Sequence, residues 1–179
     1  MSPRINLQSR KTKTTVLIVG EGGKDKAFLR HLQDIYVSRE DNIAVKVECG
    51  AGGSPRSIIE KSIRLRDVRA YDRCVVVLDA DRVLETDGKL KKRMKEKPPI
   101  EIIWVIPCME ALCLEIIEHP NFTRSKARVD LCKHEFSSYI PVDRQTEKHF
   151  YARIFPKTML DYRRAAIQDL DAILTIMQI

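Results

Sequence analysis

The sequence predicts an α/β fold: a mostly parallel, Rossmann-like sheet covered by helices, followed by a C-terminal helical extension. Short apolar runs rich in β-branched residues alternate with amphipathic stretches at helical spacing, which is the pattern of repeated strand–helix units. Glycine-rich turns follow the first two of these runs. At 179 residues the chain fits one domain and is long enough to bury a substantial core.

The first strand–helix unit is predicted over residues 14–36. Residues 14–19 are an apolar, β-branched run, as expected of a strand buried on both faces. Residues 20–23, with the sequence Gly-Glu-Gly-Gly, interrupt the run. Residues 25–36 then place apolar side chains at helical spacing. The order is therefore strand, tight glycine turn, helix.

The second unit repeats this order. Residues 43–47 are a predicted strand, and residues 50–53 form a second glycine turn. Ser54 and Pro55 supply an N-cap and a proline at the first helical position, so a helix is expected from there to about Val68.

Two further strands follow. The apolar run 74–78 ends in Asp-Ala-Asp, and a basic helix is expected near residues 87–97. A fourth strand is predicted at 100–106 and another helix at 109–118.

The chain divides into three predicted segments. Residues 1–13 form a flexible basic arm, residues 14–120 the α/β domain, and residues 121–179 an extension packed on the same domain. Residues 121–155 mix charges with scattered aromatic side chains and give no clear element. From Pro156 onward the apolar spacing predicts one long terminal helix, which either closes the core or forms the seam of a homodimer.

Composition narrows the class of protein. No apolar run approaches the roughly 20 residues that span a bilayer, and the N-terminus lacks the apolar stretch of a secretory signal. Five cysteines, an odd number without a CxxC pair, suit reduced structural thiols. We therefore expect a cytoplasmic protein without membrane association.

Basic residues exceed acidic ones, and they are clustered. Lys and Arg number 32 and Asp and Glu 25, a net charge of +7. The excess is concentrated in residues 1–13 and in 89–97, which includes Lys91, Lys92 and Arg93. Such clusters suit a polyanion such as DNA or RNA. A solvated helix face that keeps the protein soluble is an equally good interpretation.

Several chemically suggestive residues follow predicted strands. Right-handed crossovers put the carboxyl ends of parallel strands on one rim of the sheet, where ligands bind in open α/β folds. The glycine turns at 20–23 and 50–53, together with Asp79 and Asp81, follow strand ends. We therefore expect these segments to meet, although they are distant in sequence.

Asp79 and Asp81 form the most suggestive pair. In an extended segment residues i and i+2 point the same way, so both carboxylates can face one point. A divalent cation would remove their mutual repulsion, and hard oxygen ligands suit Mg²⁺, with Mn²⁺ as an alternative. The competing interpretation is that Asp79 caps the following turn while Asp81 pairs with Arg82 or faces solvent.

Glu21 strengthens the metal hypothesis. The glycines around it allow the backbone to approach a ligand closely. Alternatively, the glycines only make a tight turn and Glu21 faces water. Lys24 and Arg56, near the starts of the first two helices, are candidate phosphate contacts or plain surface charges.

These motifs resemble the Toprim family. Residues 16–23 resemble its glutamate motif and residues 75–81 its DxD motif. More narrowly, the chain resembles the RloB-like proteins, which are small stand-alone Toprim proteins, through the glycine-plus-Ser-Pro segment at 50–55 and the Pro-Cys-Met-Glu run at 107–110. The resemblance covers about residues 14–118.

The resemblance implies a function. Asp79 and Asp81 would hold Mg²⁺, Glu21 would be a further ligand or the general acid/base, and Glu110 would support a second ion. The implied activity is a nuclease that cleaves phosphodiesters of DNA or RNA, in a bacterial host-defence or mobile-element system and with a possible partner protein. The alternatives are a non-catalytic Toprim binding module in a larger nucleic-acid complex, and a nucleotide phosphohydrolase.

Overall fold

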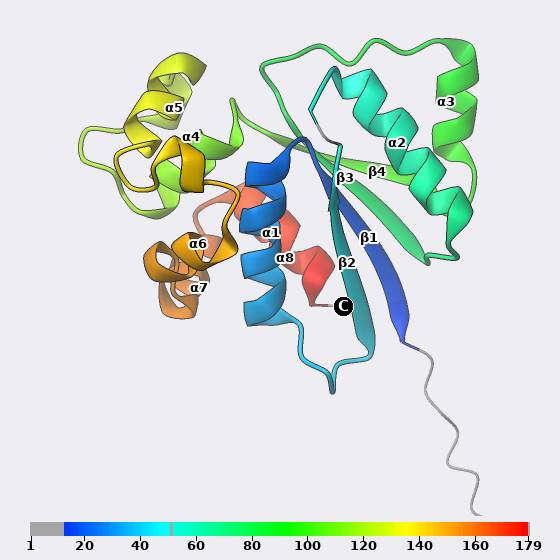
Figure 1. Cartoon of the computed structure of the whole chain (residues 1–179), viewed down its shortest axis with the longest axis horizontal. Coiled ribbons are helices and arrows are strands. Elements are labelled where there is room, and N and C mark those ends of the chain that lie inside the picture. Colours follow the sequence, from blue (N-terminus) through cyan, green and yellow to red (C-terminus); the bar gives the residue numbers. More distant parts are fainter. Residues whose placement is uncertain (1–12, 51, 179) are drawn as a thin grey trace, which may run out of the picture.

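Four parallel strands form the sheet at the centre of the protein. The computed structural model describes residues 13–50 and 52–178. The strands are β1 (Thr14–Gly20), β2 (Ile43–Cys49), β3 (Arg73–Asp79) and β4 (Ile100–Val105), in the spatial order β2-β1-β3-β4 (Figure 1). Every neighbouring pair is parallel. The predicted α/β fold with a parallel sheet is confirmed.

Helices cover both faces of this sheet. Helices α2 (Pro55–Val68) and α3 (Gly88–Lys95) lie on one face, and α1 (Gly23–Tyr36) and α4 (Met109–Ile116) belong to the other side (Figure 1). Alternate residues of a strand point to opposite faces, so β1 sends Leu17 toward the α2 side and Val16 toward the α1 side. The sheet therefore separates two hydrophobic cores.

Local sequence explains where these elements begin. The Ser54 hydroxyl accepts a hydrogen bond from the Ser57 backbone N–H, at 3.2 Å, and caps α2 as predicted. Asp87 caps α3 in the same way, accepting from the Leu90 N–H at 2.7 Å. At the start of the sheet, Asp72 accepts from the Thr15 N–H at 2.7 Å and so joins the loop before β3 to β1.

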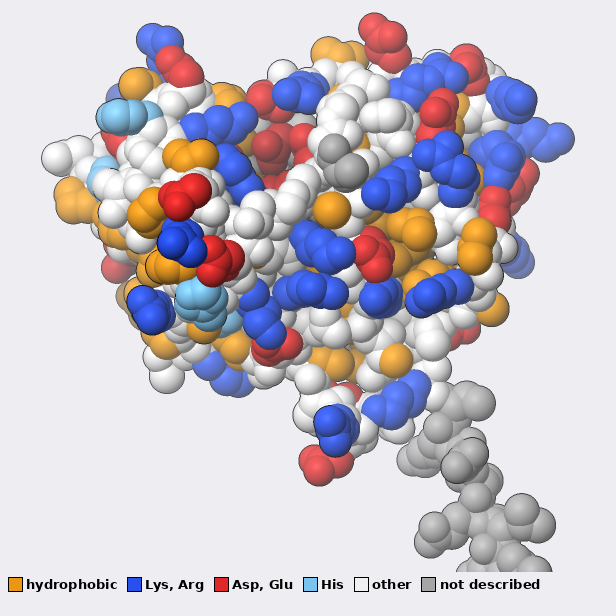
Figure 2. Space-filling model, in the orientation of Figure 1, with side chains coloured by type: hydrophobic (Ala, Val, Ile, Leu, Met, Phe, Trp, Pro, Cys, Tyr) orange, Lys and Arg blue, Asp and Glu red, His pale blue; other side chains and the backbone are white. Residues whose placement is uncertain are grey.

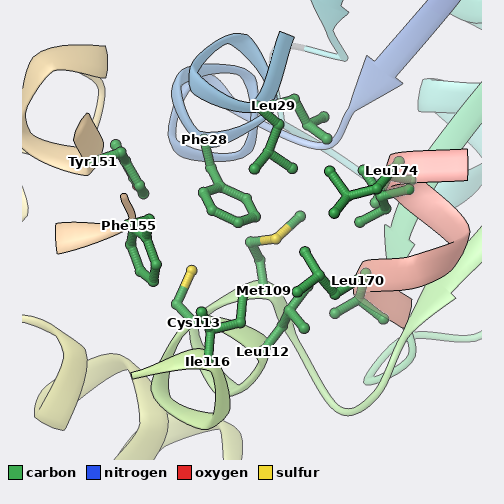
Figure 3. Packing of buried hydrophobic residues seen from close by; sticks show 14 of the residues in the cluster. Phe28, Leu29, Met109, Leu112, Cys113, Ile116, Tyr151, Phe155, Leu170 and Leu174 are labelled. Carbon is green, nitrogen blue, oxygen red and sulfur yellow. The ribbon is translucent and has the colours of Figure 1, made fainter. Parts of the chain in front are cut away.

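The segment without a clear predicted element is largely helical. It contains the short 3₁₀ helices at Arg124–Lys126 and Val142–Arg144, together with α5 (Val129–Phe136) and α6 (Lys148–Ile154). Its aromatic side chains enter the α1-side core. The ring centroids of Phe28 and Phe155 lie 5.4 Å apart, and those of Phe28 and Tyr151 lie 5.7 Å apart (Figure 3). Such contacts make this segment part of the main core.

The prediction of one long terminal helix is wrong. The structure has two helices, α7 (Lys157–Arg164) and α8 (Gln168–Met177). A single helix over these 21 residues would be about 30 Å long. It would extend past the sheet, because a strand of seven residues is only about 23 Å long. The break lets α7 pack against α4 while α8 packs against β4 and α1. Leu170 and Leu174 of α8 then face Leu112 and Leu29 in the core (Figure 3).

Two further expectations concern the basic arm and membrane association. Apart from Lys13, whose ammonium donates to the Arg39 carbonyl at 2.5 Å, the predicted basic arm at residues 1–13 lies outside the described residues. Within residues 13–50 and 52–178, none of the helices has the length and apolar character needed to cross a membrane.

Candidate acidic metal centre

Acidic side chains converge at the carboxyl ends of the strands. Glu21 follows β1, Asp79 is the last residue of β3, and Glu110 lies in the first turn of α4, after β4. The two glycine turns lie side by side, since the Gly50 N–H donates to the Gly20 carbonyl at 2.8 Å. Figure 2 shows acidic side chains gathered in a hollow on this side of the molecule, with Lys and Arg side chains on either side.

Backbone hydrogen bonds hold two of these carboxylates in place. The Asp79 N–H donates to Glu21 Oε1 at 2.9 Å, and the Met109 N–H donates to Asp79 Oδ1 at 2.9 Å. The first bond joins the end of β1 to the end of β3, and the second satisfies an otherwise unpaired N–H of α4. Each carboxylate therefore has one oxygen fixed by the backbone and a second oxygen directed elsewhere. Asp79 caps α4 rather than the turn that follows it.

Asp25 is a fourth member of the centre that the sequence analysis missed. Its Oδ2 accepts from the Gly22 N–H at 2.9 Å, which caps α1. Burial, followed by the charges of Glu110 and Glu21, raises the pKa of Asp25 to about 6. The available signal was its position four residues after Glu21, in the first turn of the following helix. An acidic residue in the first turn of a helix is also the ordinary capping pattern, so this signal was ambiguous.

Gly20 provides the room for this arrangement. A Cβ atom added to Gly20 would lie 2.7 Å from the Asp25 Cβ and 3.2 Å from Leu29 Cδ1. At Gly22, in contrast, an added Cβ would meet no atom within 4 Å. The first glycine of the turn is therefore needed for close packing of Asp25, and the second is not needed for space.

Burial, together with the charges of neighbouring acids, raises the pKa of Asp79 and of Glu21. The pKa of Asp79 is raised to about 8 by burial and then by the charges of Asp25, Glu21 and Glu110. The pKa of Glu21 is also raised, mainly by burial. Asp79 therefore holds its proton at neutral pH unless a cation supplies compensating charge.

Three cations lie near the acidic centre. The Lys24 ammonium is 3.7 Å from Glu110 Oε1, and Glu110 itself is only 7% exposed. The charges of Arg82 and of Lys133, on α5, both lower the pKa of Glu21. Lys24 was expected as a phosphate contact and lies beside the acids. Lys133 and Arg82 were not singled out from the sequence.

Asp81 is more exposed to solvent than the other predicted metal ligands, Glu21 and Asp79. Its side chain is exposed, and its charge contributes to the raised pKa of Glu21. Arg82, the alternative partner considered for it, instead donates to the Gly53 carbonyl at 2.8 Å. Asp81 therefore lies at the margin of the centre, whereas Glu21, Asp25, Asp79 and Glu110 form its interior.

The chemistry of the donor set fits a hard divalent cation. Across residues 13–50 and 52–178, no three His, Cys, Asp or Glu side chains already adopt the geometry of a metal site. However, Glu21 and Asp79 each keep a carboxylate oxygen that is not bound by the backbone bonds described above. Carboxylate oxygens are the ligands that Mg²⁺ and Mn²⁺ prefer. The charge of the ion would offset the burial penalty and the repulsion that together raise the pKa of Asp79.

The other predicted nucleic-acid contacts lie on α2 and α3, outside the acidic centre. Arg56 is ion-paired with Glu60 at 3.0 Å and with Asp87 at 2.7 Å. Arg93 is ion-paired with Glu96, at 3.0 Å, and with Asp67. The remaining two, Lys91 and Lys92, are exposed on α3.

Comparisons with protein-family models, with curated proteins and with solved structures give no match for this chain.

Proposed function

We propose that the protein is a Mg²⁺-dependent phosphodiesterase of the Toprim type that cleaves DNA or RNA. The observation that carries this proposal is the convergence of Glu21, Asp79 and Glu110 from three different strand ends, with Asp25 beneath them. Burial, followed by the charges of the neighbouring acids, raises the pKa of Asp79 to about 8, and a bound divalent cation would offset the repulsion between these charges. The Toprim motifs at residues 16–23 and 75–81 supply two of these acids.

The roles of the side chains follow from their positions. Asp79 and Glu21 would hold the ion through the carboxylate oxygens that the backbone does not bind, with Asp81 at the margin and Glu110 able to support a second ion. When bound, such ions polarise the phosphodiester and lower the pKa of the attacking water. In the alternative role, in which Glu21 does not hold the ion, it would act as the general acid/base, since burial raises its pKa. Lys24, Arg82 and Lys133 carry positive charge near the acids and would attract and orient the phosphate.

The RloB-like resemblance adds a biological setting to the proposal. It suggests a bacterial host-defence or mobile-element system and a partner protein from the same locus. The proposal for the active site does not depend on that setting.

Cleavage of end-labelled nucleic acid tests the proposed activity. Single- and double-stranded DNA and RNA would be incubated with the protein, with Mg²⁺ or Mn²⁺ and with EDTA. We expect metal-dependent cleavage by the wild type and a loss of at least about 100-fold in Asp79→Asn and Glu21→Gln, because each variant removes a charged oxygen ligand.

The matched control is Glu40→Gln. Glu40 is exposed and follows the carboxyl end of α1, at the opposite end of that helix from the acidic centre, so this variant should cleave as the wild type does. Absence of cleavage of all four polymers by a folded wild-type protein would contradict the nuclease proposal. Retained binding of nucleic acid would then favour the binding module, and hydrolysis of free nucleotides the phosphohydrolase.

A further inference from the structure

The excess positive charge of the described residues is confined to one layer of the molecule. Residues 54–69 and 85–97, which contain α2 and α3, hold 11 Lys and Arg against 5 Asp and Glu, a net charge of +6. The remaining described residues have a net charge of −2. Figure 2 shows Lys and Arg side chains gathered over α2 and α3. A polarised charge distribution of this kind attracts a polyanion to one face.

Ion pairs within this layer distinguish structural cations from available ones. Arg56 and Arg93 tie α2 to α3 and neighbouring acids, and the buried Arg66 donates to the carbonyls of Arg93, Glu96 and Pro98. In contrast, Lys61, Arg64 and Arg69 on the α2 side have no ion pair in the described part of the chain, and neither do the exposed lysines of α3. These lysines are Lys89, Lys91, Lys92 and Lys95.

Arg64 has a central position on this surface. It lines a pocket of about 360 Å³ between α2 and α3, together with Lys89 and Arg93. It also lines a second pocket, of about 370 Å³, with Lys61 and Arg69 on the side of α2 that faces β2. Arg64 thus lies between two hollows, each lined by more basic than acidic side chains.

The direction of α2 links this surface to the acidic centre. The glycine turn before α2 contacts the Glu21 turn, since the Gly52 N–H donates to the Glu21 carbonyl at 3.0 Å. From there α2 runs for 14 residues, about 21 Å at 1.5 Å per residue. That length matches about six base pairs of a duplex, at 3.4 Å per nucleotide of one strand.

We propose that the α2/α3 layer is the docking surface for a nucleic-acid phosphate backbone, with Arg64, Lys61 and the α3 lysines as its contacts. The inference rests on the proposed function, for which it names the surface that holds the substrate. Charge complementarity identifies the occupant. An anionic membrane is disfavoured as the partner, because helices that bind at a membrane surface insert an apolar face into it. The apolar side chains of α2 and α3 are instead buried in the core; they are Ile58, Ile59, Ile63 and Leu90.

Binding of a labelled 20-base-pair duplex, made as DNA and as RNA, tests this surface. Anisotropy would be measured over a salt series in EDTA, so that the result does not depend on cleavage. The double variant Arg64→Glu/Lys92→Glu is compared with Lys126→Glu/Arg153→Glu, which makes the same change in net charge at exposed positions outside the layer. Circular dichroism establishes that both variants are folded.

We expect the first variant to bind at least about 10-fold more weakly near 0.1 M salt, with a log–log salt slope shallower by about 2, because two phosphate contacts are lost. The second variant should stay within about 2-fold of the wild type. Equal weakening of both variants, no weakening of either, or tight binding of the wild type to phosphatidylserine vesicles but not to duplexes would overturn the proposal. Intact docking without cleavage would instead contradict only the proposed activity.

Discussion

At the scale of single residues, Asp79 illustrates how position changes the chemistry of a side chain. Its backbone N–H fixes Glu21 and its side chain caps α4, so one residue joins β1, β3 and α4. The same position surrounds it with three other acids. The DxD pattern predicted the presence of a carboxylate here. The capping of α4 could not be predicted, because it depends on where the β4–α4 connection lies in space.

The raised pKa of Asp79 predicts how stability depends on pH. The folded protein holds this proton up to about pH 8, whereas the unfolded chain releases it near 3.8. The contribution to the free energy of unfolding is therefore fully present below about pH 4 and is lost as the pH rises toward 8. Asp25, with a pKa of about 6, acts in the same direction over a narrower range.

Asp79→Asn should consequently be more stable than the wild type at pH 8.5 in EDTA. We expect a gain of at least about 1 kcal/mol, or about 2–4 °C in Tm. The difference should shrink at pH 5, and Mg²⁺ should stabilise the wild type selectively. Thermal unfolding followed by circular dichroism measures both effects. A Tm of the variant below that of the wild type at pH 8.5 would show that the Asp79 carboxylate is not destabilised by its neighbours.

At the scale of elements, the sequence predicts the βα turn after β1 but not the separate roles of its glycines. The glycines correctly indicated a tight turn beside Glu21. The sequence did not separate their roles, since that separation depends on which atoms lie nearby. Similarly, the apolar spacing after Pro156 predicts helical structure, which the protein has, but the break between α7 and α8 follows from packing against α4 and β4.

Substitution of the two glycines tests this reading of the turn. Gly20→Ala would force its new methyl group against Asp25, at 2.7 Å, so we expect a loss of about 1–3 kcal/mol in stability and weaker metal binding. Gly22→Ala is the matched control, because its Cβ has no neighbour within 4 Å and its φ of −135° suits any residue. Urea denaturation compares the two. Equal effects of both substitutions would refute the packing argument.

At the scale of the whole molecule, the sheet separates two sides that differ in core size and in charge. The α1 side holds the large core, in which residues of the C-terminal extension pack against α1 and α4, and it positions the acids. The α2/α3 side carries the positive charge. The alternation of strands and helices predicted this sheet well. The contribution of residues 121–155 to the core was not predictable, because their aromatic side chains follow no single periodicity.

A Mn²⁺ titration directly tests whether the convergent acids bind a divalent cation. Trp104 provides the signal: it is the only tryptophan of the chain, it is 36% exposed, and it pairs in register with Leu78, next to Asp79. We expect saturable Mn²⁺ quenching of its fluorescence in the wild type and in Glu40→Gln, reversal by excess Mg²⁺, and loss in Asp79→Asn. Equal quenching of the wild type and Asp79→Asn, or no saturable binding by the wild type, would contradict the assignment of a metal centre.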